Sequence, residues 1–269
     1  MHSGSTGIPS RYINTCFMPD LSVVIIVHNE EKNIRRCLES VQDLASEIVV
    51  VDSQSTDRTG EICLALGCRL IPREFDGYGT QKQFAVDQAI HDWIFSIDAD
   101  EEVTPGLKKE IRELFSRPVI EETGFEICFS LVYLGRKLNH GGAGGDYHLR
   151  LFNRNAGGFT KVKVHEGIHV SGQVKRLTGE VLHYSYRNLA HHLEKLNDYS
   201  TRAAEGYVQQ GRRYSRAWAV LKFPISFLQF YCCKAGFLDG YPGFMWSLMG
   251  ALYASLKIAK SIELREERQ

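Results

Sequence analysis

The sequence predicts an α/β protein with a mostly parallel, Rossmann-like sheet and a helical C-terminal region. Two observations support this: apolar, β-branched segments alternate with helical patterns between residues 21 and 97, and helical periodicity dominates from Asn188 onward. Strands that are apolar on both faces and alternate with helices are typical of a doubly wound parallel sheet. The chain has 269 residues, 43% of them hydrophobic, which is enough for one sizeable core and excludes a disordered or fibrous protein.

The first part of the chain carries strand and helix signals in alternation. Strands are expected at residues 21–27, 48–51, 69–71 and 93–97, and helices at 34–41, around 62–66 and at about 81–90. The polar run 52–57 supplies turn and N-cap residues between the second strand and its helix. This order predicts repeated strand–helix units.

After Pro118 the pattern changes. Residues 125–129 and 147–152 alternate imperfectly between apolar and polar side chains, and glycines cluster at 141–145. These features predict a mixed, partly antiparallel extension of the sheet.

Beyond the sheet, breaks at Pro224 and at 240–243 predict three helices. We therefore divide the chain into a loose leader (1–20), an α/β domain (21–187) and a helical region (188–269). The leader contains no apolar stretch of signal-peptide length, so we expect no secretion signal.

Charge and cysteine content restrict the possible partners and compartment. The formal net charge is zero, which gives no global electrostatic case for nucleic-acid binding. Between residues 200 and 260, however, the sequence contains eight Lys or Arg but only two acidic residues, a local excess of six positive charges. The seven cysteines show no CxxC spacing and mostly lie in apolar runs, which indicates small buried side chains in a reducing, cytoplasmic compartment.

Acidic residues follow two of the expected strands. Asp52 ends the second strand, and Asp98 and Asp100 follow the fourth, with Glu101 and Glu102 next in sequence. Ligands of open α/β sheets lie at the carboxyl ends of the strands, and clustered carboxylates require a positive partner. A Mg²⁺ or Mn²⁺ ion that bridges carboxylates to phosphates is the simplest occupant. The alternative is that these acids only favour the N-terminus of the helix that follows.

Three segments resemble the family 2 glycosyltransferases of GT-A fold: SVVIIVHNEE (22–31), IVVVDS (48–53) and DWIFSIDADE (92–101). The match covers roughly residues 20 to 185. Segments 149–152 (LRLF), 164–166 (VHE) and 236–240 (GFLDG) are similar to the lipopolysaccharide inner-core members. One departure is Gln54, at a position where the family often has glycine.

The resemblance implies a nucleotide-sugar site. Asn29 and Glu30 would border the nucleotide, Asp52 would accept a hydrogen bond from uracil, and Lys82 would approach the base or the phosphates. Lys82 is alternatively a solvated helix lysine. Other nucleotide-binding motifs are absent: no G-x-G-x-x-G follows the first strand, and residues 77–82 lack the P-loop spacing.

The resemblance also implies a metal site. Asp98 and Asp100 would hold the sugar and, through Mg²⁺ or Mn²⁺, the pyrophosphate. His183 is our candidate for a third metal ligand. Its alternative is an ordinary buried, hydrogen-bonded histidine.

Glu166 is the candidate catalytic base, because the family is generally inverting and a carboxylate must deprotonate the acceptor hydroxyl. The alternative for Glu166 is a salt bridge to Lys163 or Arg150. Residues 165–169 also satisfy the zinc-protease motif H-E-x-x-H. That chemistry needs a helix, whereas the flanking residues predict a strand, on which histidines four residues apart lie about 13 Å from each other.

The helical region has the composition of a membrane-surface segment. Seventeen uncharged residues lie between Asp239 and Lys257, fewer than the ~20 that cross a bilayer, and basic residues flank them. Packing of these helices on one another is the alternative. We expect a cytoplasmic, peripheral inner-membrane enzyme.

These observations together predict an inverting glycosyltransferase that moves glucose from UDP-glucose to a lipid-anchored saccharide of the lipopolysaccharide inner core. One alternative keeps the fold and changes the acceptor to polyprenyl phosphate or another surface-polysaccharide precursor. The other is a non-catalytic protein that binds a sugar nucleotide or serves as a scaffold.

Overall fold

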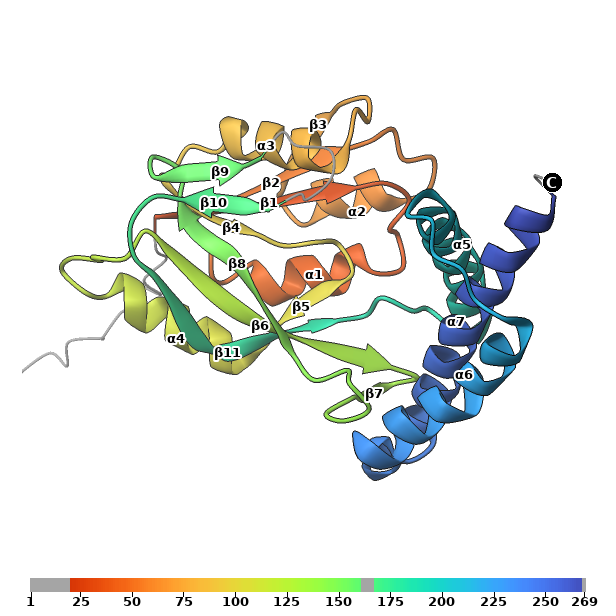
Figure 1. Ribbon diagram of the computed structural model, residues 1–269. Coiled ribbons are helices and arrows are strands. Elements are labelled where there is room, and N and C mark those ends of the chain that lie inside the picture. Colours follow the sequence, from red (N-terminus) through yellow and green to blue (C-terminus); the bar gives the residue numbers. More distant parts are fainter. Residues whose placement is uncertain (1–19, 161–166, 268–269) are drawn as a thin grey trace, which may run out of the picture.

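The computed structural model describes residues 20–160 and 167–267 and shows an α/β domain flanked by three long helices (Figure 1). In the described residues, nine strands form one sheet, in the order β3-β2-β1-β4-β8-β6-β11-β5, with β7 paired to β6 at one end. The expected α/β class with a C-terminal helical region is confirmed.

The parallel half of the sheet follows the sequence pattern closely. Its strands are β1 (Leu21–Val27), β2 (Glu47–Asp52), β3 (Arg69–Pro72) and β4 (Trp93–Ser96), and all neighbouring pairs are parallel. The helices between them are α1 (Ile34–Val41), α2 (Thr59–Ala65) and α3 (Tyr78–Gln88). Helix α3 begins three residues before the expected Gln81, directly after Gly77, whose φ of 126° ends the preceding loop.

The other half of the sheet is mixed, as expected. β8 (Asp146–Asn153) is antiparallel to β4 and to β6 (Gly124–Tyr133), while β11 (Val174–His183) is parallel to β6 and antiparallel to β5 (Glu101–Val103). β7 (Arg136–Lys137) forms a hairpin with β6, and α4 (Pro105–Phe115) has Thr104 as its N-cap. Reversal of direction at β8 brings the end of β11 beside the acidic segment that follows β4.

A separate hairpin consists of β9 (Gly157–Phe159) and β10 (Ile168–Val170). His169 therefore lies on a strand, where a helical zinc motif cannot form. Its motif partner His165 lies outside the described residues.

Helices and the hairpin cover the two faces of the sheet. Apolar side chains of α1, α2 and α4 pack on one face, around a core that contains Ile25, Phe95 and Leu151. α3 and the β9–β10 hairpin pack on the other face, around Val24 and Phe152. Because both faces are buried, the central strands are apolar throughout, which is why their sequences read as continuous hydrophobic runs.

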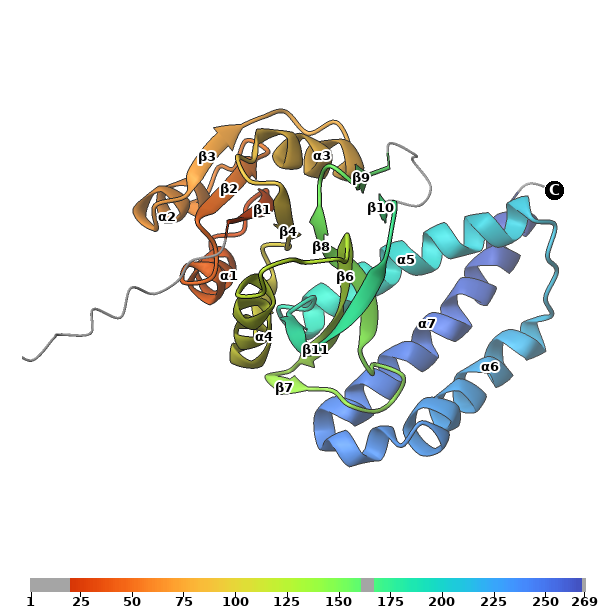
Figure 2. The same ribbon diagram turned by 90° about the vertical axis from the view of Figure 1, so that its left-hand side faces the viewer.

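Three long helices form the C-terminal region: α5 (Leu189–Gln209), α6 (Arg216–Leu228) and α7 (Gly240–Glu266), with a π-helical turn at Gln229–Cys233 and a 3₁₀ turn at Gly236–Asp239. Figure 2 shows α7 between α5 and α6, and it packs against both. The boundary that we place at residue 187 falls in the loop between β11 and α5.

The break expected at Pro224 is wrong, because Pro224 lies inside α6. Proline leaves the carbonyl of Val220 without its helical donor, but Pro224 and Val220 are both exposed, so water can satisfy that oxygen. The actual break comes earlier, after α5, where Gly211 has a φ of 71°. The second expected break is confirmed, since α7 begins at Gly240.

Asp239, in the 236–240 motif, connects the helices to the sheet domain. Its buried carboxylate accepts hydrogen bonds from the backbone N–H groups of Asn139 (3.0 Å) and His140 (2.8 Å), and His140 Nδ1 lies 3.1 Å from Asp239 Oδ1. Burial alone would raise the pKa of Asp239, but these hydrogen bonds lower it. The motif thus fixes the start of the glycine-rich loop against the helical region.

Cysteine burial agrees with the expectation only in part. Cys37, Cys63 and Cys68 are buried, whereas Cys232 and Cys233 are exposed. The latter two lie on the π-helical turn, in which no residue is buried, so the burial predicted from the apolar sequence around them is wrong.

Within residues 20–160 and 167–267, no helix is both long and apolar enough to cross a bilayer.

Candidate active site

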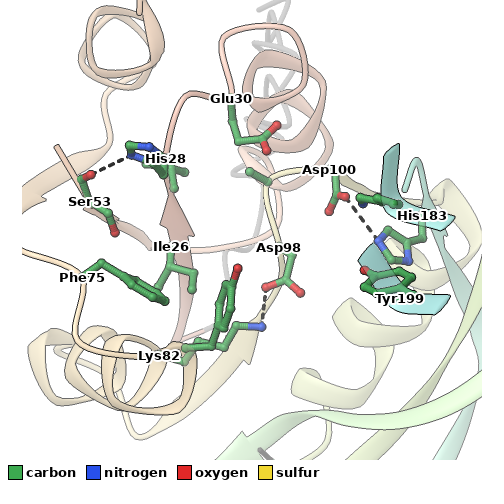
Figure 3. A pocket seen from close by; sticks show the side chains of 14 residues that line it. Ile26, His28, Glu30, Ser53, Phe75, Lys82, Asp98, Asp100, His183 and Tyr199 are labelled. Carbon is green, nitrogen blue, oxygen red and sulfur yellow. Dashed lines mark hydrogen bonds and ion pairs between the residues drawn. The ribbon is translucent and has the colours of Figure 1, made fainter. Parts of the chain in front are cut away.

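A cavity of about 660 Å³ opens at the C-terminal ends of β1 and β4 (Figure 3). The sequence-predicted residues Glu30, Lys82, Asp98, Asp100 and His183 all line it. The remaining lining residues come from the ends of β1 and β2, the segment that leads into α3, the segment after β4, and α5: Ile26, Val27, His28, Ser53, Phe75, Tyr78, Ala99, Lys195 and Tyr199.

The loops after β1 and β2 are joined to each other. Asn29 Oδ1 accepts a hydrogen bond from the backbone N–H of Thr56 (2.8 Å), and the Asn29 N–H donates to Ser55 Oγ (2.9 Å). Asp52 Oδ1 accepts from both the N–H (3.0 Å) and the hydroxyl (2.6 Å) of Ser55. Asn29 and Asp52 thus shape the rim, and neither is among the residues that line the cavity.

Two of these loop residues have left-handed backbone conformations, Asn29 with φ 55° and Gln54 with φ 60°. Glycine adopts positive φ without strain, which gives a physical reason for glycine at the position of Gln54 in the resembling family. In this chain Gln54 takes the same conformation, so the loop forms without glycine.

Glu30 projects into the cavity from the loop after β1 (Figure 3). Asn33 Nδ2 donates a hydrogen bond to Glu30 Oε2 (2.8 Å). Burial raises the pKa of Glu30 above its ordinary value, although the bond from Asn33 opposes this shift.

Two basic side chains surround Asp98. Lys82 Nζ, from α3, lies 2.5 Å from Asp98 Oδ1, and Arg150 Nη2, from β8, lies 3.3 Å from Asp98 Oδ2. Arg150 Nη2 also lies 3.4 Å from Oε1 of the buried Glu101. The positive charge that the acidic sequence requires is therefore supplied, at Asp98 and Glu101, by protein side chains.

This arrangement shifts the pKa values of Asp98 and Glu101 in opposite directions. Burial would raise the pKa of Asp98, but Lys82 and Arg150 hold it well below its usual range. Glu101 is more deeply buried and shares Arg150 with the negative Asp98, so its pKa rises to about 7. Glu101 Oε2 also accepts a hydrogen bond from the backbone N–H of Asp98 (2.7 Å), which fixes the turn that presents Asp98.

Asp100 faces His183 across the same cavity (Figure 3). His183 Nε2 lies 3.4 Å from Asp100 Oδ2, and the backbone N–H of Tyr184 donates to the Asp100 carbonyl (2.8 Å). Burial would lower the pKa of His183, but the nearby Asp100 carboxylate raises it.

The described residues contain no group of three or more His, Cys, Asp or Glu side chains placed to hold a metal ion. Asp100 and His183 nevertheless offer one carboxylate oxygen and one imidazole nitrogen to the cavity. Mg²⁺ is commonly held by one or two carboxylates and completes its coordination with phosphate oxygens and water. These two donors therefore fit an ion whose remaining ligands are oxygens of a bound diphosphate and water.

Sequence reasoning missed several lining residues. Phe75 and Tyr78 form an edge-to-face pair, with ring centroids 4.9 Å apart, at the side of the cavity near α3. Lys195 and Tyr199 come from α5, in the helical region. Of these residues, only the aromatic pair could have been found from the sequence. Two aromatic residues in a segment that contains Gly77 and Gly79 belong to no apolar helix or strand pattern, which indicates a surface role.

Sequence reasoning places Arg150 only as a possible partner of Glu166, although a lone arginine within the apolar run 149–152 indicates a buried acidic partner. Glu166 itself lies outside the described residues.

Comparisons with known proteins show the family and the fold of this chain. Residues 22–122 match the family model described as glycosyl transferase family 2. The chain is 31% identical over 257 residues to an uncharacterized glycosyltransferase of Rickettsia typhi, covering 92% of this chain and 88% of the relative. It is 34% identical over 247 residues to the lipopolysaccharide core biosynthesis glycosyltransferase LpsC of Rhizobium meliloti, covering 89% and 91%.

Among solved structures, the mannosyltransferase PcManGT of Pyrobaculum calidifontis, in complex with GDP-Man and Mn²⁺, has a similar fold. The TM-score is 0.51 at 14% identity, and the alignment covers 91% of this chain and 88% of that one.

Proposed function

Because the chain belongs to glycosyltransferase family 2 and has the GT-A fold, we propose that it is an inverting glucosyltransferase. In this proposal it transfers glucose from UDP-glucose to a lipid-anchored saccharide of the lipopolysaccharide inner core. The observation that carries the proposal is the convergence of Glu30, Lys82, Asp98, Asp100 and His183 on one cavity at the carboxyl ends of the parallel strands. The similarity to LpsC supports the choice of acceptor.

The donor half of the proposal rests on the size and chemistry of the cavity. A volume of about 660 Å³ is within the range of small-molecule sites and suits a nucleotide sugar. Phe75 and Tyr78 offer exposed rings on which a uracil base can stack. In this proposal Asn29 and Asp52 hold the rim that recognises the base, and Lys82 places a positive charge beside the phosphates.

Asp98 and Asp100 take different parts. Because its pKa is low, the Asp98 carboxylate is charged at neutral pH and can accept hydrogen bonds from sugar hydroxyls. Asp100 and His183 are the residues that would hold Mg²⁺ or Mn²⁺, which when bound supplies positive charge next to the departing diphosphate.

Glu166 stays our prediction for the base that removes the proton from the acceptor hydroxyl. The test is Glu166→Gln, which we expect to abolish transfer while UDP binding is retained. A Glu166→Gln protein with unchanged transfer rate would assign the base elsewhere.

Membrane association is the last part of the proposal. Trp218, Leu221, Ile225 and Leu228 form one stripe along α6, at i, i+3, i+7 and i+10, and they are 38–55% exposed. Lys222 lies beside this stripe, with its Nζ 5.9 Å from the Trp218 ring centroid. An exposed apolar stripe with adjacent basic residues supports binding to the surface of an anionic membrane.

The decisive experiment measures UDP release from UDP-glucose, with and without Mn²⁺ and a truncated lipopolysaccharide core acceptor. Asp100→Asn and His183→Ala should lose turnover, whereas Asp198→Asn, an exposed control on α5, should not. Turnover only with polyprenyl phosphate would move the acceptor to the first alternative. Nucleotide binding without turnover on any acceptor would favour the non-catalytic alternative.

A further inference from the structure

A second cavity, of about 330 Å³, adjoins the first. It lies between α5, α7 and the loop that contains Gly142, and Tyr199 lines both cavities. α5 and α7 pack against each other, and Figure 2 shows both helices beside the sheet domain. A group bound in the second cavity would therefore lie next to the proposed donor site.

Aromatic side chains dominate this second cavity. Tyr186, Tyr199, Phe230, Trp246 and Tyr253 line it, together with the buried His192. The rings of Tyr186 and His192 lie 4.0 Å apart, centroid to centroid, and Trp246 lies 5.9 Å from Tyr186. These contacts hold Tyr186, His192 and Trp246 in place, so this part of the cavity presents rigid ring faces.

Rigid aromatic faces suit a sugar ring. One face of a pyranose presents C–H groups with partial positive charge, and an aromatic face carries partial negative charge. Polar groups that fix a ligand's orientation are also at hand in the hydroxyls of the tyrosines.

Three lysines lie close to rings that line this cavity, although none of them is itself among the lining residues. Lys195 Nζ lies 5.4 Å from the Tyr186 ring centroid, Lys234 Nζ lies 5.1 Å from that of Phe230, and Lys257 Nζ lies 4.7 Å from that of Tyr253. Within the part of the chain that the structure describes, none of the three forms an ion pair with a carboxylate. Three ammonium groups without acidic partners favour an anionic ligand.

We propose that the second cavity is the acceptor site and that it takes a pyranose carrying an anionic group, a carboxylate or a phosphate. This inference rests on the proposed function, because an acceptor site presupposes the proposed glycosyl transfer. The aromatic rings bind the sugar ring, and Lys234 and Lys257 bind its charge. Lys195 lines the donor cavity and contacts Tyr186 of the acceptor cavity, so it lies at the junction of the two.

Intrinsic fluorescence tests this proposal directly, because Trp246 lines the cavity. The probes are glucuronic acid, glucose 6-phosphate and neutral glucose, each titrated into the full-length protein without donor. We expect saturable quenching by the two anionic sugars and a response to glucose that is at least about tenfold weaker, the factor that one charge pair commonly contributes. The quenching should be lost in Trp246→Phe.

Two variants separate charge from stacking. Lys234→Gln with Lys257→Gln should weaken binding of both anionic sugars about tenfold or more, while the matched double variant Lys32→Gln with Lys109→Gln, at exposed positions, should not. Tyr253→Leu should weaken all three sugars, and Tyr147→Leu, an exposed tyrosine on β8, should leave them unchanged. Far-UV circular dichroism of each variant establishes that it is folded.

Equal responses to the charged and neutral sugars, or no saturable response to any of them, would overturn the proposal. So would anionic binding that survives the Lys234 and Lys257 substitutions. UDP binding is measured by calorimetry on the same samples. If UDP binds and the sugars fail, the proposed function stands without this acceptor site, whereas loss of UDP binding would count against the proposed function itself.

Discussion

Arg150 is the side chain on which the acidic segment after β4 depends. It is the cation that Asp98 and the buried Glu101 share. We expect Arg150→Met to reduce the free energy of unfolding by about 3–5 kcal/mol, because it leaves the buried Glu101 without its basic partner, whereas Asp98 keeps Lys82. Urea denaturation followed by circular dichroism measures this change.

The matched control is Arg176→Met. Arg176 pairs with Glu126 (2.8 Å) on the same sheet but is 64% exposed, so its loss should change the free energy of unfolding far less than the loss of Arg150. Equal stability of the two variants would mean that Arg150 does not compensate the buried charge.

His192 gives the protein a specific pH dependence. Burial lowers the pKa of His192 from 6.5 to about 4, and its Nδ1 lies 2.8 Å from the Tyr133 hydroxyl. The unfolded chain takes up this proton below pH 6.5 and the folded chain only below about 4. The contribution of His192 to the free energy of unfolding is therefore complete above pH 6.5, and the free energy of unfolding should fall as the pH decreases from 6.5 toward 4.

Other groups titrate in the same range, so the comparison is with His192→Gln. Urea denaturation of both proteins at several pH values should give a smaller decline for the variant. Two parallel curves would show that His192 is protonated in the folded protein as readily as in the unfolded one.

At the scale of elements, close approach of two backbone segments explains why residue 243 of the helical region is glycine. Gly243 on α7 lies against the 3₁₀ turn, and a Cβ there would come 2.0 Å from the carbonyl oxygen of Gly236. Gly243→Ala must push the two elements apart, so we expect a loss of about 1–3 kcal/mol in the free energy of unfolding.

Gly206 is the counterpart on α5, where a Cβ would meet nothing within 4 Å. Gly206→Ala should increase stability by up to about 1 kcal/mol, because alanine loses less backbone entropy in a helix. Thermal unfolding of both variants checks the opposite signs. A Gly243→Ala protein as stable as the wild type would mean that the contact between α7 and the 3₁₀ turn is loose.

At the scale of the whole molecule, the proposed membrane surface predicts how the protein partitions. Replacing Leu221, Ile225 and Leu228 by glutamine should reduce co-flotation with anionic phosphatidylglycerol vesicles about tenfold or more, since each buried aliphatic side chain contributes about 1.5–3 kcal/mol. The control replaces Ile90 and Val119, which are 66% and 69% exposed but lie on the sheet domain.

Flotation that is indifferent to lipid charge, or that is unaffected by the three α6 substitutions, would remove membrane association from the proposal. The transferase assignment would remain, because it depends on other residues.

Local sequence patterns predicted most of the parallel half of the sheet. The strands ending at Val27, Asp52 and Ser96 are apolar because both of their faces are buried, and the acidic residues follow because strand ends face the ligand. Chemistry that lies within one short segment, such as Asp98 and Asp100, is therefore visible before folding.

The sequence did not predict which side chains these acidic residues contact. Arg150 is 52 residues from Asp98 in the chain and reaches it only because β8 runs antiparallel to β4. In the same way, α5 brings Lys195 and Tyr199 into a cavity formed by the ends of β1 and β4. Local patterns carry no information about such contacts, since strand order and helix docking are set by long-range packing.

The sequence by itself determined the fold class, the strand–helix order of the first half and the acidic residues at the strand ends. The tertiary structure decided which cations neutralise those acids, that α6 continues through Pro224, and that the helical region completes the candidate active-site cavity. The physical reason is that side-chain periodicity records which face of an element is buried, whereas the identity of the group it is buried against depends on how distant elements pack.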